Sequence, residues 1–266
     1  MIRRTTSSGI YRFILFLLAT LPLLTACLLK QGTPAKQITV AAASDLAPAF
    51  EELARAFTAE TKTRVVYSFG SSGLFAHQIA NGAPIDVFAA ANISYVNDLE
   101  RQGLILSDTK AIYARGRIVL WTSQAASYKP RGLQDLIRPE VERIAIANPD
   151  HAPYGTAARQ ALQSANVWNA VRSKIIYADN VRQALQFAQT GNADVAIIAL
   201  SLSLSSDGEG VPISEELHQP LDQALAVIRG TRREAQARTF VSFVNSPAGQ
   251  SIMTKYGFVI PNSPGR

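Results

Sequence analysis

Short apolar runs alternate with amphipathic segments along the chain from residue 38 onward. Residues 38–43 (ITVAAA) are typical of a strand that is buried on both faces. In residues 46–57 the apolar side chains instead recur every three or four positions, which predicts a helix. The same reading predicts further strands at residues 64–69, 86–90, 117–122, 143–147, 174–177, 194–199 and 225–229. It predicts further helices at residues 74–80, 94–102, 156–164, 181–189, 233–245 and 249–256.

Strands and helices that alternate with short connections indicate an α/β fold. The alternation occurs in two stretches, so we expect two lobes, each a mostly parallel sheet flanked by helices. The chain is expected to cross between the lobes near residues 117–122 and to return near residues 222–229. The predicted lobes are residues 38–118 with 228–266, and residues 119–227. Ligands of such sheets bind beyond the carboxyl ends of the strands.

The first 37 residues follow a different pattern. A basic, hydroxyl-rich stretch precedes an apolar stretch, residues 13–24, that is too short to span a bilayer comfortably. Shortly after it comes Cys27, the one cysteine of the chain. This arrangement resembles a bacterial lipoprotein signal, which predicts a signal peptide at residues 1–26, a lipidated Cys27 and a tether at residues 27–37. The alternative is a plain secretory signal in which Cys27 is incidental.

Charge and cysteine content exclude several classes of protein. The formal net charge is +6, but three arginines of the predicted signal account for half of it. The remaining basic residues are scattered and do not alternate with aromatic side chains, so we expect no nucleic-acid partner. One cysteine excludes an internal disulfide and a multi-cysteine zinc site. No segment after the signal is apolar enough to predict a membrane span.

Four predicted strand-to-helix junctions share one design, in which a small or polar residue follows the strand and a helix begins. The residues at these junctions are Ser44, Ser71, Ser72, Tyr154, Gly155 and Val181. A helix N-terminus presents unpaired N–H groups and about half a positive charge, which together bind anions. Arg182 is the one cation in these junctions. This composition favours a small oxyanion held by neutral donors over a nucleotide, which usually recruits arginine or a P-loop lysine.

Each of these residues alone also has a structural explanation. A serine before a helix usually caps it, and Ser44 alone would be interpreted in that way. Asp45 would be a first-turn acid, and Tyr154 alone a core or surface aromatic residue. The junctions form a site only if the fold brings them together.

The chain resembles the periplasmic molybdate-binding proteins of ABC transporters in five segments, which read ITVAAASDLAPAFEELARAF, VVYSFGSSGLFAHQIANGAPIDVFAAAN, ANPDHAPYGTAARQAL, DNVRQALQFAQTGNADVAIIALS and FVSFVNSPAGQSIMTKYGFVIP. The resemblance covers nearly all of residues 38–261. It implies a two-lobed type II periplasmic binding protein that closes on molybdate or tungstate and delivers it to an ABC transporter permease. It also implies an exported, monomeric protein without cofactor or catalytic residues. The separate resemblance of residues 1–27 to a lipoprotein signal predicts that a lipid anchors this protein to the membrane.

The same resemblance implies roles for particular residues. Ser44 and Ser72 correspond to serines that bind the oxyanion, and Tyr154 and Val181 to positions that offer a backbone N–H. Possible additional contacts are Ser71, Asp45, Gly155 and Ser201. No metal ion is implied, because molybdenum is bound only as its oxyanion.

The chain departs from the family pattern at one position. Many members have a tyrosine directly after the strand that corresponds to residues 194–199, and here the chain reads Ala199-Leu200-Ser201. We expect the Tyr154 hydroxyl to replace that donor. The alternatives are that Ser201 replaces it, or that one donor is missing.

Other functions fit these residues less well. Gly70-Ser71-Ser72-Gly73 lacks the glycine spacing of a nucleophile elbow, and nothing else marks a catalytic triad. The three histidines are not spaced as metal ligands. Within binding proteins, the alternative is another small anion such as sulfate, chromate or phosphate, because cavity size decides between tetrahedral oxyanions.

Overall fold

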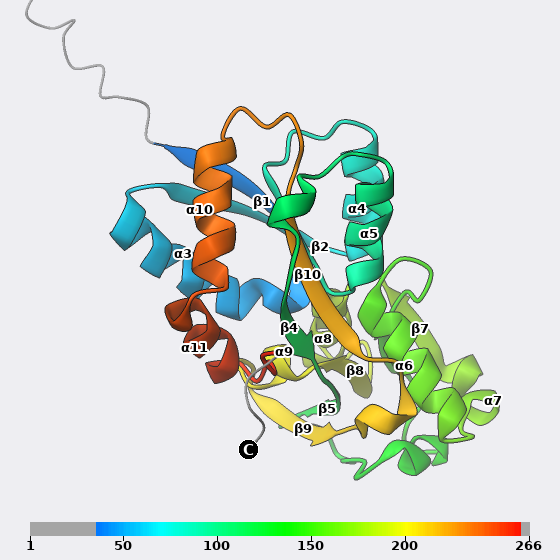
Figure 1. The fold of residues 1–266 in the computed structure, drawn as a ribbon. Helices are drawn as coiled ribbons and strands as arrows, with labels where there is room; N and C mark the ends of the chain where they lie inside the picture. Colours follow the sequence, from blue (N-terminus) through cyan, green and yellow to red (C-terminus); the bar gives the residue numbers. More distant parts are fainter. Residues whose placement is uncertain (1–35, 262–266) are drawn as a thin grey trace, which may run out of the picture. The chain divides into compact units, whose positions relative to one another are not determined.

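Two five-stranded sheets organise residues 36–261, the part of the chain that the computed structural model describes (Figure 1). The first sheet has the order β2-β1-β3-β10-β4 and the second the order β7-β6-β8-β5-β9. The strands of the first sheet are β1 (Gln37–Ala43), β2 (Arg64–Gly70), β3 (Val87–Ala90), β4 (Ala111–Gly116) and β10 (Leu221–Val227). Those of the second are β5 (Ile118–Ser123), β6 (Ile144–Ala147), β7 (Ile175–Ala178), β8 (Val195–Ala199) and β9 (Gly208–Pro212).

Each sheet is mixed, with one strand running opposite to the other four, so the sheets are mostly parallel as expected. β1 pairs in parallel with β2 and β3, but β10 runs antiparallel to β3 and β4. In the second sheet, β6 pairs in parallel with β7 and β8, while β5 is antiparallel to β8 and β9. The chain enters the second sheet through β5 and returns to the first sheet through β10, and these two strands are the antiparallel ones.

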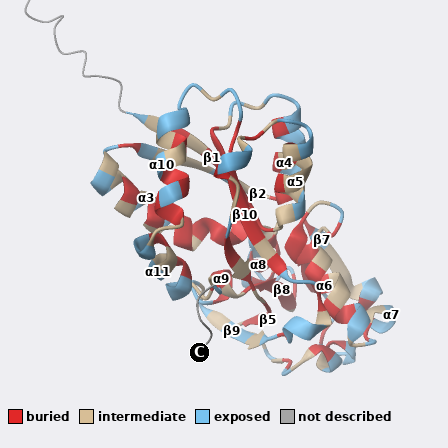
Figure 2. Cartoon of the chain, in the orientation of Figure 1, coloured by how far each residue is buried: buried red, intermediate tan, exposed pale blue. Residues whose placement is uncertain are grey.

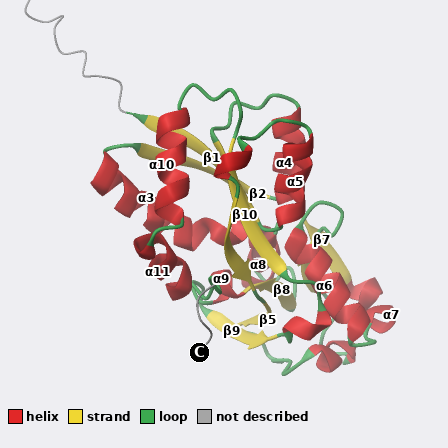
Figure 3. Cartoon of the chain, viewed as in Figure 1, coloured by secondary structure: helices red, strands yellow, loops and turns green. Residues whose placement is uncertain are grey.

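Helices cover both faces of each sheet (Figures 1 and 3). The helices with the first sheet are α3 (Ala47–Thr61), α4 (Ser72–Ala80), α5 (Ile93–Arg101), α10 (Glu234–Val244) and α11 (Pro247–Lys255). Those with the second are α6 (Pro153–Ser164), α7 (Trp168–Val171), α8 (Val181–Gln189) and α9 (Leu200–Ser203). The predicted helices are therefore present, as is each predicted strand; β4, β9, α7 and α9 were not expected from the sequence.

The interior strands β1, β3, β5, β6, β8 and β10 are largely buried, as their apolar runs predicted, whereas the edge strands β2, β7 and β9 are mostly half-buried or exposed (Figure 2). Successive side chains of β3 point to opposite faces of the sheet, so they pack in different clusters of the core. Phe88 packs in the cluster that includes Phe75 of α4 and Val96 of α5. Its neighbours Val87 and Ala89 pack in the larger cluster on the other face of the sheet.

The chain crosses from the first sheet to the second between β4 and β5, close to the predicted position. The return crossing was predicted near residues 222–229, and this prediction was wrong. Leu221–Val227 is already part of the first sheet, since β10 is hydrogen-bonded to both β3 and β4. The chain therefore returns between β9 and β10, and α10 and α11 complete the first lobe as expected.

The predicted signal peptide, the lipidation site Cys27 and most of the tether lie outside the described residues. Within residues 36–261, none of the helices combines the length and the apolar character that crossing a bilayer requires.

Candidate anion-binding site

The junctions singled out in the sequence meet at one small cavity between the two lobes. Its lining includes Ser44, Asp45, Ser71, Ser72, Tyr154 and Val181, together with Asn180 and Pro153. The volume open to the centre of a water-sized sphere is about 10 Å³, close to the minimum for one water molecule. In this closed arrangement the cavity suits a very small ligand and excludes a sugar or a nucleotide.

The first wall comes from the start of α4. Ser72 is the first residue of this helix, so its backbone N–H has no intrahelical acceptor. The Ser72 side chain is fully buried, and its Oγ accepts a hydrogen bond of 2.9 Å from the N–H of Ala91. Because the oxygen is held as an acceptor, the hydroxyl hydrogen is left to donate to a ligand.

The second wall comes from the start of α8. Asn180 caps this helix, and its side-chain oxygen accepts from the N–H groups of Arg182 and Gln183, each at 3.1 Å. The cap leaves the N–H of Val181, the first residue of the helix, without an acceptor in the described part of the chain. Val181 is 3% exposed, so an N–H left unpaired there would be costly without a ligand.

Ser44 connects this wall to the other lobe. It opens the 3-10 turn Ser44–Leu46 directly after β1, and it is 2% exposed. Its Oγ accepts a long hydrogen bond of 3.4 Å from the N–H of Arg182 on α8. As with Ser72, this leaves the hydroxyl hydrogen free to donate.

The third wall comes from the start of α6. Pro153 occupies its first position and has no N–H, so Tyr154 carries the first donor of this helix. The next two N–H groups, of Gly155 and Thr156, both donate to the carbonyl of Ala152 at 2.9 and 3.0 Å. Tyr154 lines the cavity at this helix start, and its role as a backbone donor to the ligand stays a prediction.

The Tyr154 hydroxyl, by contrast, is directed elsewhere. It donates to Oδ2 of Asp45 at 3.0 Å, and Gln223 donates to the same carboxylate oxygen at 2.6 Å. The phenol tip also lies against Gly116, where a Cβ atom would come within 2.1 Å of it. In this conformation the hydroxyl donates to Asp45, and its expected role as a replacement oxyanion donor stays a prediction.

The other two expected contacts lie behind the walls. Ser201 donates from Oγ to the backbone carbonyl of Asp45 at 2.8 Å, so its role here is to brace the turn after β1. Gly155 is packed against the end of β6, and a Cβ atom there would come within 2.0 Å of the Ala147 carbonyl oxygen. Neither residue lines the cavity.

Ser71 joins the two lobes. Its hydroxyl donates to the carbonyl of His151, and the ring Nδ1 of His151 lies 2.9 Å from the same Oγ. Because Ser71 gives its hydrogen to the carbonyl, Nδ1 must be the donor in the second contact. The N–H of Gly73 also donates to the His151 carbonyl at 2.9 Å, so these contacts form a latch between the loop before α6 and the start of α4.

The electrostatics of the cavity are unusual for an anion site. No lysine or arginine is among its lining residues, and Asp45 is the single charged one. Burial raises the pKa of Asp45 to about 6, although the hydrogen bonds from Gln223 and Tyr154 lower it. The donors available to a ligand are therefore three helix N-termini and two serine hydroxyls.

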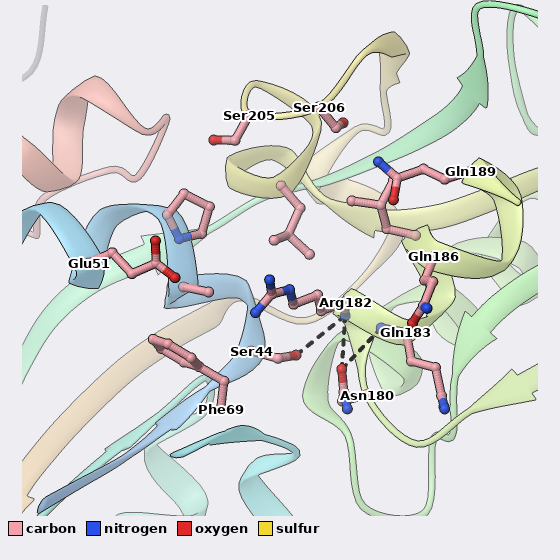
Figure 4. Close-up of a pocket in the computed structure, with 14 residues that line it drawn as sticks. Ser44, Glu51, Phe69, Asn180, Arg182, Gln183, Gln186, Gln189, Ser205 and Ser206 are labelled. Atoms are coloured by element: carbon pink, nitrogen blue, oxygen red, sulfur yellow. Dashed lines mark hydrogen bonds between the residues drawn. The ribbon is translucent and has the colours of Figure 1, made fainter. Parts of the chain in front are cut away.

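A second, much larger space adjoins the cavity. This groove of about 740 Å³ shares Ser44 and Asn180 with the cavity and is lined by polar side chains of α8 and the loop after α9. Figure 4 shows the Arg182 side chain extending into the groove, with Glu51 of α3 on the facing wall. Both side chains are exposed, so the groove is a solvated approach to the cavity.

Residues 38–259 match the family model of bacterial extracellular solute-binding proteins. The chain belongs to this family. This solute-binding protein is 31% identical to the molybdate-binding protein ModA of Rhodobacter capsulatus over 85% of its length and 89% of the relative's. The solved periplasmic molybdate-binding protein of Azotobacter vinelandii matches it with a TM-score of 0.78 and 30% identity, over 84% of this chain and 99% of that one.

A relative from another lineage is named as a lipoprotein. The putative ABC transporter substrate-binding lipoprotein YvgL of Bacillus subtilis is 26% identical to the solute-binding protein, over 88% of this chain and 95% of the relative.

Sequence reasoning missed several residues that shape this site. Gln223 and Tyr113 support Asp45 from β10 and β4, with a hydrogen bond of 2.9 Å between the Tyr113 hydroxyl and the Gln223 side chain. Both residues lie outside the strands predicted from the sequence, so the pattern carried no signal for them. The structure places His151, one of the three histidines, in the latch to Ser71. Among the described residues there is no cluster of metal-binding side chains.

Proposed function

We propose that this protein captures molybdate or tungstate outside the cytoplasm and delivers it to an ABC importer. The observation that carries the proposal is the meeting of three helix N-termini and two serine hydroxyls at a cavity without a cation. The relatives named above that are molybdate-binding proteins support the choice of ligand.

The donors suffice for tight binding. A hydrogen bond to a charged group contributes roughly 1.5–3 kcal/mol. Five donors would contribute about 8–15 kcal/mol, from which the cost of association is subtracted. Near the upper end of this range, the remainder after a cost of about 4 kcal/mol is about 11 kcal/mol, which corresponds to affinity tighter than micromolar. No protein cation is needed, since the dianion is stabilised by dipoles that are already in place.

Calorimetric titration tests the ligand. The purified protein, freed of bound anions by dialysis, is titrated with molybdate, tungstate, sulfate and phosphate in one buffer. We expect molybdate and tungstate to bind at micromolar concentration or below, and sulfate at least about a hundredfold more weakly, which is ~2.7 kcal/mol. Sulfate or phosphate binding as tightly as molybdate would assign the cavity to another oxyanion, and binding of none of the four would refute the oxyanion function.

We also propose that the protein is anchored to the membrane through a lipid on Cys27. The proposal rests on the pattern of residues 1–27 and on the relative that is named as a lipoprotein. Replacement of Cys27 by serine should move the protein from the membrane fraction to the soluble extracytoplasmic fraction, with molybdate affinity unchanged. A Cys27→Ser protein that stays with the membrane would contradict the anchor.

We infer that the mature protein binds as a monomer and performs no chemistry on its ligand. Both lobes of a single chain supply the walls of the cavity, so one copy completes the site. Sedimentation with and without molybdate should give the mass of one chain in both states, and a ligand-dependent dimer would contradict this.

A further inference from the structure

A buried carboxylate in the wall of an anion site calls for a physical explanation. Asp45 lines the cavity and is 0% exposed. Like charges in a desolvated site repel strongly, because the effective dielectric constant is far below that of water. A dianion placed beside an ionised Asp45 would bear a cost that the neutral donors must offset.

The two oxygens of Asp45 have different surroundings. Oδ2 accepts from the Tyr154 hydroxyl and from the Gln223 amide. Oδ1 is buried and has no hydrogen-bond partner among the described residues. A buried acceptor of this kind costs free energy when the group is ionised, whereas a protonated Oδ1 becomes a donor.

Neutral groups face Asp45 from the elements packed around it. They are Tyr154 of α6, Gln223 of β10, Tyr113 of β4 and Ser201 of α9. Charged side chains on the elements around this turn are Glu51, Glu52, Arg115, Arg159, Arg182 and Asp222. Arg115 is paired with Asp222, and none of these cations contributes to the pKa of Asp45.

We propose that Asp45 takes a proton from solvent when the lobes close on a dianion, so that capture of the oxyanion is coupled to proton uptake. The inference rests on the proposed function. Proton uptake removes the like charge from the wall and places a hydrogen on the oxygen that has no partner. The proton returns to solvent when the lobes open and the ion leaves.

The raised pKa of the Asp45 carboxyl group supports this coupling. Burial already brings the pKa of Asp45 to about 6 in the closed protein, and a neighbouring dianion raises it further. The pKa of the complex then lies above that of the ligand-free protein. Between the two values, the affinity should fall as the pH rises, by up to about tenfold for each pH unit, and should level off above the higher value.

Calorimetry with sodium molybdate measures the proton directly. Titrations at pH 7 in two buffers with different ionisation enthalpies give the number of protons taken up with each ion. We expect more than about 0.3 proton per ion in the wild type. The Asp45→Asn variant keeps a side-chain oxygen for Tyr154 and Gln223 and cannot titrate, so we expect no uptake and an affinity that is independent of pH.

The results of these titrations distinguish a failure of the proton coupling from a failure of the proposed molybdate binding. Tight molybdate binding with less than about 0.1 proton taken up by the wild type would overturn the coupling and leave the function intact. Uptake that persists in Asp45→Asn would also overturn it. The His151 imidazole lies against Ser71 of the cavity wall, so the His151→Gln variant is the control, and its proton uptake should equal that of the wild type.

Discussion

The anion cavity and the groove beside it share Ser44 and Asn180, yet the rest of their walls differ in kind. The cavity is small and buried, and its donors to a ligand are backbone N–H groups and hydroxyls. The groove is large and solvated, and it contains Arg182 and Glu51. The larger space therefore offers a small anion fewer buried hydrogen-bond donors than the small cavity does.

The difference shows where charge can be placed at low cost. A buried arginine would need a partner whenever the ligand is absent, and leaving it unpaired costs several kcal/mol. Helix N-termini carry partial charge that is fixed by the fold and needs no counterion. An exposed arginine stays hydrated, so it can attract an anion from solution without that cost.

Replacement of Gly155 by valine should have the largest effect. Its side chain would collide with the Ala147 carbonyl and displace the start of α6, which carries the Tyr154 N–H. We expect a loss of about 1–3 kcal/mol in the free energy of unfolding and more than about a hundredfold weaker molybdate binding. Thermal unfolding and calorimetry measure the two effects. Gly132→Ala is the control, since a Cβ there meets no atom within 4 Å. If Gly155→Val bound molybdate with wild-type affinity, the start of α6 would not be part of the binding site.

Ser72→Ala should weaken binding by about 10- to 150-fold, because it removes one hydrogen bond of roughly 1.5–3 kcal/mol to a charged ligand. The adjacent Ser71→Ala is a matched comparison, since the Ser71 hydroxyl is engaged with His151. That variant should lose the latch and release the ion faster, with an affinity reduced by less than about tenfold. Equal losses in the two variants would show that Ser72 has no direct contact with the ion.

Tyr154→Phe should weaken binding by about 2- to 10-fold, through a less firmly held Asp45. A phenol that bonded the oxyanion directly would instead produce a loss similar to that of Ser72→Ala. Calorimetry on both variants in one buffer therefore decides which acceptor the hydroxyl serves. The backbone N–H of residue 154 is unchanged in either case.

Arg182→Gln should have the smallest effect, confined to the rate of association. We expect a slowing of about 2- to 5-fold at low ionic strength, which disappears in about 1 M salt. Stopped-flow fluorescence over a range of salt concentrations measures the rate. Gln186→Ala lies in the same groove without a charge and should leave the rate unchanged. A large loss of equilibrium affinity in Arg182→Gln would mean that the cation contacts the bound ion.

Local chemistry explains what could be predicted from the sequence. The donor role of Val181 follows from a cap residue and a helix start that are adjacent in the chain, and the Tyr154 N–H follows from Pro153 before it. Both depend on short-range rules that the sequence displays. The family resemblance then supplied what local rules could not, namely that these helix starts meet.

The features that the sequence could not predict depend on long-range contacts. The direction of the Tyr154 hydroxyl depends on Gly116 and Gln223, which are distant in the sequence and leave room and a partner behind the wall. The return crossing was misplaced because the apolar run of Leu221–Val227 would suit either sheet. Nothing in a buried strand pattern tells which neighbours it pairs with.

The position of β10 has a consequence for how this chain is made. β10 lies between β3 and β4, so the first sheet is divided until residues 221–227 have been synthesised. The N-terminal half therefore emerges from the ribosome without the strand that joins β4 to the rest of its sheet, and pairing over such a distance is slow. We expect the nascent chain to remain unfolded until it is nearly complete, a state in which a polypeptide can still be threaded across a membrane.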